Sequence, residues 1–226
     1  MQVAEVFESI QGEGPWAGTK SLFIRTSGCN LRCSFCDTPY TSWSPEGTAW
    51  SLDQLVQRVQ QSDAPDVVLT GGEPLLVPEI AKLAAACRQQ QKRVTIETAG
   101  TVASNDVECD MLAISPKLAN STPDHPHWKI RHEQARFRPD IVQKLISRNP
   151  SILKFVVEHQ DDIDEVLLWL AEVPSIQRSM VWLMPQAKTR KQLHEKSELV
   201  REIARLHNFN FSSRLHVEMY DDLRGI

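Results

Sequence analysis

Residues 21–36 have the sequence SLFIRTSGCNLRCSFC, which decides the fold and points to the chemistry. The stretch begins with the apolar run 21–25, which predicts a short buried strand. Cys29, Cys33 and Cys36 follow with C-x3-C-x2-C spacing. Three thiolates can hold three corners of a cubane iron–sulfur cluster and leave the fourth iron open to a small molecule, whereas an electron-transfer cluster normally has four cysteine ligands. The spacing therefore indicates chemistry at an open iron atom.

A structural zinc site or a group of reduced core thiols is the alternative explanation of this triplet. Its spacing differs from the paired C-x2-C knuckles of structural zinc sites. The other two of the five cysteines are Cys87, in an apolar run of a predicted helix, and Cys109, just before a predicted strand. We expect both to lie in the core, and neither is assumed to be a fourth ligand. An odd number of cysteines also disfavours a disulfide framework.

The composition is that of an ordinary globular chain. Its 226 residues suit one domain, 1–226, with a sizeable core, and 41% apolar and 24% charged residues fit that class. The net charge of −4 argues against a nucleic-acid partner. We expect no membrane association and a cytoplasmic location, because the sequence has neither a signal segment nor an apolar run of membrane-crossing length. The reducing cytoplasm also suits free thiols and clusters.

Short β-branched runs alternate with amphipathic stretches, which is the pattern of βα units around a parallel sheet. The predicted strands are 21–25, 66–70, 94–97, 111–115, 153–157, 180–184 and 215–219. The predicted helices are one that begins at Ser51, where Gln54 completes a capping box, and 78–91, 140–148, 161–172 and 188–206. About six βα units are fewer than the eight of a closed barrel. The predicted fold is therefore α/β, an incomplete, splayed parallel barrel of the (βα)6 type.

Residues 119–138 break this alternation. They contain Pro123, His125, Pro126 and His127 and show no clear period, so we expect an irregular segment. A long irregular segment in a compact domain is often functional, and a plain surface excursion is the other possibility.

A second motif, TGGEP at residues 70–74, stands at the end of the predicted strand 66–70. Two glycines let a ligand approach the backbone closely, and the exposed amides and carbonyls can bind an amino-acid moiety. A plain strand-to-helix turn would also use this sequence. The cysteine triplet follows the strand 21–25 in the same way, and ligands bind at the carboxyl ends of parallel strands. Both motifs therefore point to one site.

The cysteine triplet together with residues 71–74 resembles the radical S-adenosylmethionine (SAM) superfamily. The resemblance implies a radical SAM partial barrel and a [4Fe–4S] cluster whose open iron is chelated by the amino and carboxylate groups of SAM. One electron from the reduced cluster would cleave a carbon–sulfur bond of SAM and free a 5′-deoxyadenosyl radical. The glycine motif would touch the methionine part of SAM.

Five further segments narrow the resemblance. In chain order they are QGEG at 11–14, FIR at 23–25, DT at 37–38, IETAGT at 96–101 and ISPK at 114–117. In this order they resemble the 7-carboxy-7-deazaguanine synthase family. The resemblance covers nearly the full chain, is sharpest from Gln11 to about Lys117, and weakens after Lys154.

This resemblance implies a carbon–nitrogen lyase. Its substrate would be 6-carboxy-5,6,7,8-tetrahydropterin, from whose C6 the radical abstracts hydrogen. Ring contraction and loss of ammonia would then give 7-carboxy-7-deazaguanine, in 7-deazapurine (queuosine) biosynthesis, with SAM regenerated in each turnover. The resemblance also implies a magnesium ion, an electron donor such as flavodoxin or ferredoxin, and a homodimer.

The resemblance assigns cofactor residues by position. Cys29, Cys33 and Cys36 match the cluster ligands. The residues that match SAM contacts are Phe35, Cys36, Asp37, Gly72, Ser115, Pro116, Lys117, Met184, Pro185, Gln186 and Ala187. The segment 184–187 departs from the family, which more often has a Gln-Pro pair there, and a strand-ending loop is the alternative explanation of 115–117.

The resemblance assigns substrate residues in the same way. The matching residues are Ile10, Gln11, Gly12, Arg25, Thr70 and the terminal Ile226, and Thr38 matches the magnesium ligand. Arg25 can meet the substrate carboxylate as a bidentate fork, or it can form a surface ion pair. The family often has a histidine near its C-terminus. Tyr220 stands at that place here and His216 lies four residues earlier, so either can supply the polar contact.

Two other functions stay open. A glycyl-radical activating enzyme shares the cysteine spacing and acts on a large protein partner, but residues 11–14, 37–38 and 115–117 argue against it. A non-enzymatic iron–sulfur or zinc-binding protein would need a fourth protein ligand and would have no affinity for SAM.

Overall fold

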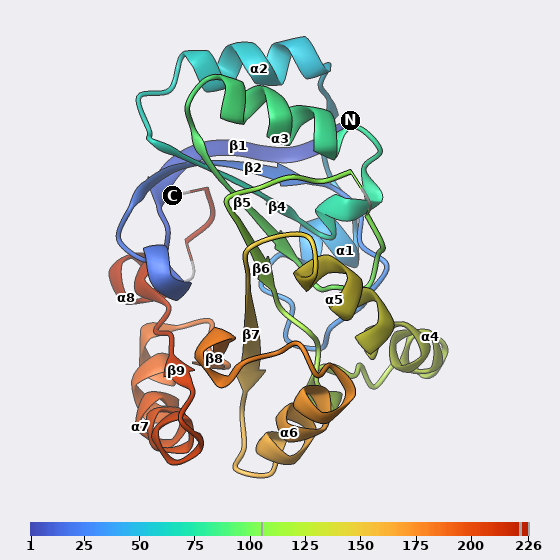
Figure 1. Cartoon of the computed structure of the whole chain (residues 1–226), viewed down its shortest axis with the longest axis vertical. Coiled ribbons are helices and arrows are strands. Elements are labelled where there is room, and N and C mark those ends of the chain that lie inside the picture. Colours follow the sequence, from blue (N-terminus) through green and yellow to red (C-terminus); the bar gives the residue numbers. More distant parts are fainter. Residues whose placement is uncertain (105, 222, 226) are drawn as a thin grey trace.

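The computed structural model describes residues 1–104, 106–221 and 223–225. Their strands are β1 (Gln2–Ile10), β2 (Lys20–Thr26), β3 (Thr48–Ala49), β4 (Asp66–Gly71), β5 (Arg93–Thr98), β6 (Met111–Ile114), β7 (Ser151–Val157), β8 (Val181–Pro185) and β9 (Asn210–Phe211). They form one sheet in the order β3-β1-β2-β4-β5-β6-β7-β8-β9 (Figure 1). β1 is antiparallel to both neighbours, and every pairing from β2 to β9 is parallel. Because β3 and β9 are free edges, the sheet is open, and the predicted incomplete parallel barrel is confirmed.

α-Helices pack against both halves of the sheet. They are α1 (Pro39–Ser42), α2 (Leu52–Gln60), α3 (Ile80–Gln89), α4 (Pro126–Arg136), α5 (Pro139–Ile146), α6 (Asp162–Glu172), α7 (Arg190–His207) and α8 (Leu215–Tyr220). α2 and α3 pack together near β5, whereas α6 and α7 pack on β7 and β8 (Figure 1). Within the described ranges, no helix has the length and apolar character needed to cross a bilayer.

The central strands form where the sequence offers apolar side chains to both faces. In β4 the side chains of Val67, Val68 and Leu69 are all buried, although successive side chains of a strand point to opposite faces. This is typical of a parallel strand with helices on one face and packed interior on the other. The predicted strands from 21–25 to 180–184 accordingly match β2, β4, β5, β6, β7 and β8.

The start of α2 follows from its local sequence. Ser51 Oγ accepts a hydrogen bond of 3.1 Å from the backbone nitrogen of Gln54, and the Gln54 side chain accepts one of 2.8 Å from the Ser51 nitrogen. This is the predicted capping box, which pairs two backbone donors that a helix start otherwise leaves free.

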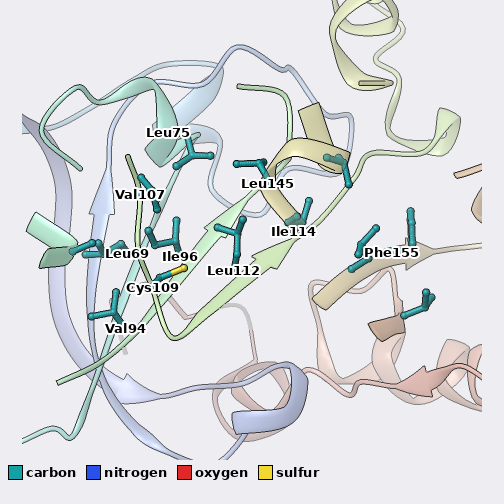
Figure 2. Packing of buried hydrophobic residues seen from close by; sticks show 14 of the residues in the cluster. Leu69, Leu75, Val94, Ile96, Val107, Cys109, Leu112, Ile114, Leu145 and Phe155 are labelled. Carbon is teal, nitrogen blue, oxygen red and sulfur yellow. The ribbon is translucent and has the colours of Figure 1, made fainter. Parts of the chain in front are cut away.

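The main hydrophobic core lies along the central strands (Figure 2). Leu69, Ile96 and Leu112 come from the neighbouring strands β4, β5 and β6, and each is fully buried. Burial of a side chain of this size contributes about 1.5–3 kcal/mol. Cys109 and Cys87 pack in the same core, so their predicted structural place is confirmed.

The predicted last strand, 215–219, is wrong. These residues form α8, and the sheet ends instead with the short β9. On a strand, Leu215, Val217 and Met219 would share one face. In the structure Val217 is buried and Met219 is 47% exposed, so the apolar alternation of this segment does not reflect a strand.

The predicted irregular segment 119–138 is also wrong. It contains the 3-10 turn Ala119–Ser121 and the α-helix α4. The buried residues of α4 are His132 and Arg136, both polar. A helix is recognised in a sequence by an apolar stripe, and this one offers none.

The sequence analysis also predicts no strand at β1. Of its nine residues Val3 is buried and most others are half-buried. The strand therefore lacks the alternation of buried and exposed side chains that marks a strand with one solvent-exposed face. β1 matters for the site because it carries Ile10 to the mouth of the barrel.

Candidate active site

A cavity of about 540 Å³ lies at the carboxyl ends of the parallel strands. Residues near the ends of β2, β4, β5, β6, β7 and β8 line it, as does the loop that follows β2. The predicted site residues that line it are Ile10, Gln11, Gly12, Arg25, Cys29, Cys33, Phe35, Cys36, Asp37, Thr38, Thr70, Gly72, Ser115, Lys117, Met184 and Gln186. Pro116, Pro185 and Ala187 are described residues outside this lining. Ile226 lies outside the described residues.

The three clustered cysteines share one wall of the cavity. Cys33 is buried with Leu31 and Ala99, and Cys29 and Cys36 pack against this group. The carbonyl of each cysteine accepts a hydrogen bond from a side chain, which is that of Arg32 within the loop and those of Trp43 and Lys188 outside it. The donors to Cys29, Cys33 and Cys36 are Arg32 Nη1 at 2.7 Å, Trp43 Nε1 at 3.0 Å and Lys188 Nζ at 2.7 Å. The loop is therefore held in place before any cofactor binds.

The triplet fits an iron–sulfur cluster. Burial raises the pKa of the Cys29 thiol to about 11 and that of Cys33 to about 12. A coordinated thiol is deprotonated, so metal binding here would release protons. Across the described part of the chain, no three His, Cys, Asp or Glu side chains converge tightly enough for a single metal ion. The three cysteines of a cubane cluster do not have to converge on one ion, because each cysteine binds its own iron atom.

Cys87 and Cys109 lie apart from the triplet. Both belong to the main core, whereas the triplet packs in a separate small group. The Cys109 thiol is buried beside Asn149, with Sγ 3.7 Å from Oδ1. The fold therefore places neither cysteine in the group around the triplet.

Gly72 sits where two backbone segments meet. A β-carbon at this position would lie 2.2 Å from the carbonyl oxygen of Gly28 and 2.7 Å from that of Thr41, so only glycine fits. The next residue, Glu73, donates its backbone N–H to Gly28 at 2.9 Å. The glycine motif therefore packs against the segment that leads into the cysteine loop, in addition to lining the cavity.

Glu73 braces this arrangement from inside the protein. It is fully buried, and its carboxylate accepts hydrogen bonds from Thr98 Oγ1 at 2.7 Å, the Ala99 nitrogen at 2.8 Å and the Leu75 nitrogen at 3.0 Å. Burial raises the pKa of Glu73 despite these bonds. Because Glu73 follows β4, and Thr98 and Ala99 lie at the end of β5, this carboxylate ties two strand ends together.

A buried network of charges forms another part of the cavity lining. The Lys154 ammonium pairs with the Glu13 carboxylate. Arg214 Nε lies 3.1 Å from the same carboxylate, and Arg214 Nη2 lies 2.6 Å from Asp37 Oδ2. The side chains of Lys154, Glu13 and Arg214 are only 7%, 11% and 9% exposed, whereas that of Asp37 is 50% exposed. Two cations and two carboxylates thus alternate within the cavity.

The network stays ionised at neutral pH. Burial acts to raise the pKa of Glu13, but the positive charges of Lys154 and Arg214 outweigh it and hold that pKa well below its ordinary value. Burial acts to lower the pKa of Lys154, and the Glu13 charge raises it overall. The sequence analysis assigned no role to these residues. A lysine inside the apolar run 153–157 was a signal that could have found Lys154, whereas nothing near Arg214 marks it.

Gln11 connects this network to β5. Its Nε2 donates to Glu97 Oε1 at 3.2 Å, and its Oε1 accepts from the Glu13 nitrogen at 3.1 Å. Glu97 also lines the cavity. It belongs to the segment 96–101, and the sequence analysis assigned no separate role to Glu97. The predicted Gln11 thus lies beside a carboxylate that sequence reasoning missed.

Arg25 both lines the cavity and forms an ion pair. Its Nε lies 2.9 Å from Glu5 Oε2, and Tyr40 donates its hydroxyl to the same oxygen at 2.9 Å. Glu5 also pairs with Arg224 at 2.7 Å. Because the side chains of Arg25 and Glu5 are only 18% and 11% exposed, this is a largely buried pair rather than a surface ion pair, and Arg25 is the member that lines the cavity.

The C-terminal segment closes over the same cavity. Of the described residues, His216 lines it and Tyr220 does not, which separates the two candidates for the C-terminal polar contact. His216 Nε2 lies 3.9 Å from Glu13 Oε1, and burial lowers the pKa of this imidazole. Residues 223–225 also line the cavity.

Thr38 stands between the cysteine loop and α1. Its Oγ1 accepts a hydrogen bond of 3.3 Å from Thr41 Oγ1 and lies 3.9 Å from Cys36 Sγ. The hydroxyl lines the cavity, where its oxygen is a hard donor of the type that magnesium prefers.

Lysine side chains hold the other two segments predicted to contact SAM, residues 115–117 and 184–187. Lys117 Nζ donates to the carbonyl and to the hydroxyl of Ser115, each at 2.8 Å, which curls this turn over the end of β6. Lys196 Nζ donates to Gln186 Oε1 at 2.7 Å after β8. Ser115, Lys117 and Gln186 line the cavity.

An open parallel half-barrel with three cysteines after its first parallel strand defines a class of protein. The sequence pattern of the Radical SAM superfamily matches residues 23–127. The fold agrees with the crystal structure of QueE from Escherichia coli, with a TM-score of 0.71 and 22% identity over 95% of this chain and 94% of that one. The chain is thus a radical SAM protein, a class that binds a [4Fe–4S] cluster and SAM.

Two full-length relatives narrow the class. The chain is 43% identical to a 7-carboxy-7-deazaguanine synthase of Rhodopirellula baltica, over 99% of this chain and 88% of the relative. It is 38% identical to one of Halobacterium salinarum, over 98% and 91%. The chain therefore belongs to the 7-carboxy-7-deazaguanine synthase family of radical SAM enzymes, and it is an enzyme.

Proposed function

We propose that this protein converts 6-carboxy-5,6,7,8-tetrahydropterin to 7-carboxy-7-deazaguanine with loss of ammonia. The observation that carries the proposal is that one cavity joins the cysteine triplet to the buried pair of Lys154 and Glu13. Its volume is in the usual range for a small-molecule site of about 300–1,000 Å³. A glycyl-radical activating enzyme would instead have to admit a protein segment.

The cofactors would occupy the cysteine side of the cavity. Cys29, Cys33 and Cys36 would hold the cluster. When bound, the cluster and SAM supply one-electron cleavage of a carbon–sulfur bond and a 5′-deoxyadenosyl radical. The residues that would orient SAM are Phe35, Cys36, Asp37, Gly72, Ser115, Lys117, Met184 and Gln186, all of which line the cavity.

Arg25 would bind the carboxylate of the pterin. Glu5 holds the guanidinium through Nε, which leaves the terminal nitrogens as the donors of a bidentate fork. Thr70 lines the cavity on the neighbouring strand, paired with Arg25 in the parallel register. The two side chains would therefore contact the same end of the substrate.

Glu97 would accept hydrogen bonds from the N–H edge of the pterin ring. An ionised carboxylate has two oxygens with about four acceptor sites, and Gln11 occupies one of them. The positive charge of Lys154 attracts the carboxylate of Glu97, and the ammonium group is a hydrogen-bond donor on the same wall. Paired donors and acceptors on one buried wall suit a flat heterocycle that carries both.

We further propose a magnesium ion at Thr38. The Oγ1 of Thr38 keeps acceptor capacity beside its bond from Thr41. Magnesium commonly takes few protein ligands and fills its octahedron with waters and substrate oxygens. The substrate carboxylate near Arg25 would supply such an oxygen.

His216, Gly12 and Ile10 would line the far side of the pterin. Residues 223–225 line the cavity, so this segment would also lie beside the pterin. Closure by this segment would exclude water from the reacting atoms.

We propose that the chain acts as one domain, as a homodimer in the cytoplasm, and that flavodoxin or ferredoxin reduces the cluster. The free state of all five cysteines suits a reducing compartment. The dimer and the electron donor rest on the resemblance of the chain to its family.

The test is anaerobic turnover after reconstitution of the cluster. SAM, magnesium, dithionite and 6-carboxytetrahydropterin are added, and the products are identified by mass. We expect 7-carboxy-7-deazaguanine. If 5′-deoxyadenosine forms without that product, the substrate assignment is wrong. If neither forms although the cluster is intact, the chain is not this enzyme.

A further inference from the structure

The outer side of the cysteine loop is covered by α4. The Arg32 nitrogen, between two of the cysteines, donates to His132 Nδ1 at 3.2 Å, and the Ser34 nitrogen donates to the Ser121 carbonyl at 2.9 Å. Ala135 of α4 packs against the group that holds the triplet. The helix α4 is thus in direct contact with the loop that would bind the cluster.

The exposed first half of α4 is cationic and partly apolar. Lys129 and Arg131 are exposed, and Ile130 between them is 61% exposed. Trp128 lies half-buried beside two guanidinium groups, 4.3 Å from Arg32 and 5.7 Å from Arg131. The positive charge of this half of the helix contrasts with the net charge of −4 of the whole chain.

The acidic groups of the helix do not cancel this charge. Glu133 is engaged by Arg136, with 2.9 Å between Nη2 and Oε2, and by the Thr122 hydroxyl. Asp124 precedes the helix and is exposed, so it is the nearest opposing charge on this segment. Arg136 also pairs with Glu165 of α6, so the four cations Arg32, Lys129, Arg131 and Arg136 stand against three carboxylates, and the balance is still positive.

None of the residues of α4 belongs to the main hydrophobic core. α4 lies at the margin of the molecule in Figure 1, away from the sheet, and its buried residues are both polar. Together with Trp128 and Arg131, the exposed Ile130 gives this helix a surface that is both apolar and cationic. It has the composition of a binding surface, where Trp and Arg dominate.

We propose that the exposed first half of α4 together with Arg32, defined by Arg32, Trp128, Lys129, Ile130 and Arg131, is the docking surface for an acidic one-electron carrier protein. The proposal rests on the proposed function, since it names the route of the electron to the same cluster. One electron leaves the reduced flavin or iron–sulfur centre of the carrier and enters the cluster, and no bond forms or breaks in that step. Electron-transfer encounters are small, weak and steered by opposite charge, which fits a patch of this size.

The test uses the double variant Lys129→Glu/Arg131→Glu of the full chain with its cluster. The matched control is Lys82→Glu/Lys191→Glu, which makes the same charge change at exposed positions of α3 and α7. Biolayer interferometry measures binding of two acidic probes, an oxidised flavodoxin and a plant-type ferredoxin, at low and high salt. We expect the carrier that binds the unmutated chain to lose about tenfold in affinity on the double variant, and salt to weaken binding to the unmutated chain.

A second readout separates docking from the rest of the reaction. Formation of 5′-deoxyadenosine from SAM is driven either by the reduced carrier or by dithionite. We expect the double variant to lose the carrier-driven rate and keep the dithionite-driven rate. The proposal is overturned if neither carrier binds the unmutated chain, if the control loses as much affinity, or if dithionite-driven cleavage is lost too. Carrier binding without deazaguanine formation would instead reject the proposed substrate and leave the docking surface standing.

Discussion

A β-carbon on Gly12 would lie 1.9 Å from Nδ1 of His216. The loop after the first strand and the helix α8 near the end of the chain therefore touch inside the cavity. The Leu215 nitrogen also donates to the Gly12 carbonyl at 2.8 Å, which fixes the start of α8 on this loop. The absence of a side chain at Gly12 is what lets His216 reach the site.

Gly12→Ala should impair turnover without loss of the cluster. The added methyl group would displace the His216 imidazole from the cavity, so kcat/KM for the pterin should fall by about tenfold or more, which is at least ~1.4 kcal/mol. Iron content should stay unchanged. The double variant Gly12→Ala/His216→Ala should be no worse than His216→Ala alone. A further loss in the double variant would show that Gly12 acts by another route.

The buried ion pairs should respond unequally to neutralisation. Glu13→Gln leaves Lys154 without its carboxylate and should cost about 3–5 kcal/mol in free energy of unfolding. Lys154→Met leaves Glu13 paired with Arg214 and should cost less, about 1–3 kcal/mol. Anaerobic urea unfolding measures both. The matched control is Lys20→Met at the exposed pair with Asp63, which should leave the free energy of unfolding nearly unchanged. An equal cost for all three variants would refute the buried network.

The stability of the protein should depend on the protonation of His132. Burial lowers the pKa of this imidazole from 6.5 to about 4, so the folded state binds its proton less readily than the unfolded state does. Stability is therefore full above pH 6.5 and falls as the pH drops toward 4. At pH 5 the loss should reach up to about 2 kcal/mol. Urea unfolding at pH 7 and pH 5 checks this, and His132→Gln should flatten the slope. An unchanged slope in that variant would mean that other groups titrate.

The cluster should need the triplet and no other cysteine. Cys87→Ala/Cys109→Ala removes two core thiols and should keep the iron content of the unmutated protein, at some cost in stability. Cys36→Ala should lose the cluster. Iron analysis and the visible absorption spectrum measure both. Loss of iron in the first variant would revive a fourth protein ligand.

The fold was largely predictable because the central strands are buried on both faces. Continuous apolar runs such as residues 66–70 need no tertiary information to be recognised. α4 was not predictable, because its buried residues are His132 and Arg136 and their partners, the cysteine loop at Arg32 and Glu165 of α6, are distant in the sequence. In residues 215–219 apolar alternation indicated a strand, but packing of the loop at Gly12 against the start of this segment selects a helix instead.

The site divides in the same way. The cysteines and Gly72 could be predicted because local spacing and a tight backbone approach leave a trace in the sequence. The pairs Lys154–Glu13 and Arg214–Glu13 join residues 141 and 201 positions apart. Only the folded sheet brings such charges together, so no local pattern could have indicated them.

The most direct test of the proposed reaction is its stoichiometry under anaerobic conditions. Ammonia, 7-carboxy-7-deazaguanine, SAM and 5′-deoxyadenosine are quantified in one reaction with excess pterin and limiting SAM. The account predicts ammonia and deazaguanine in equal amounts, both exceeding the SAM supplied. Consumption of SAM with accumulation of 5′-deoxyadenosine, and neither ammonia nor deazaguanine, would contradict it.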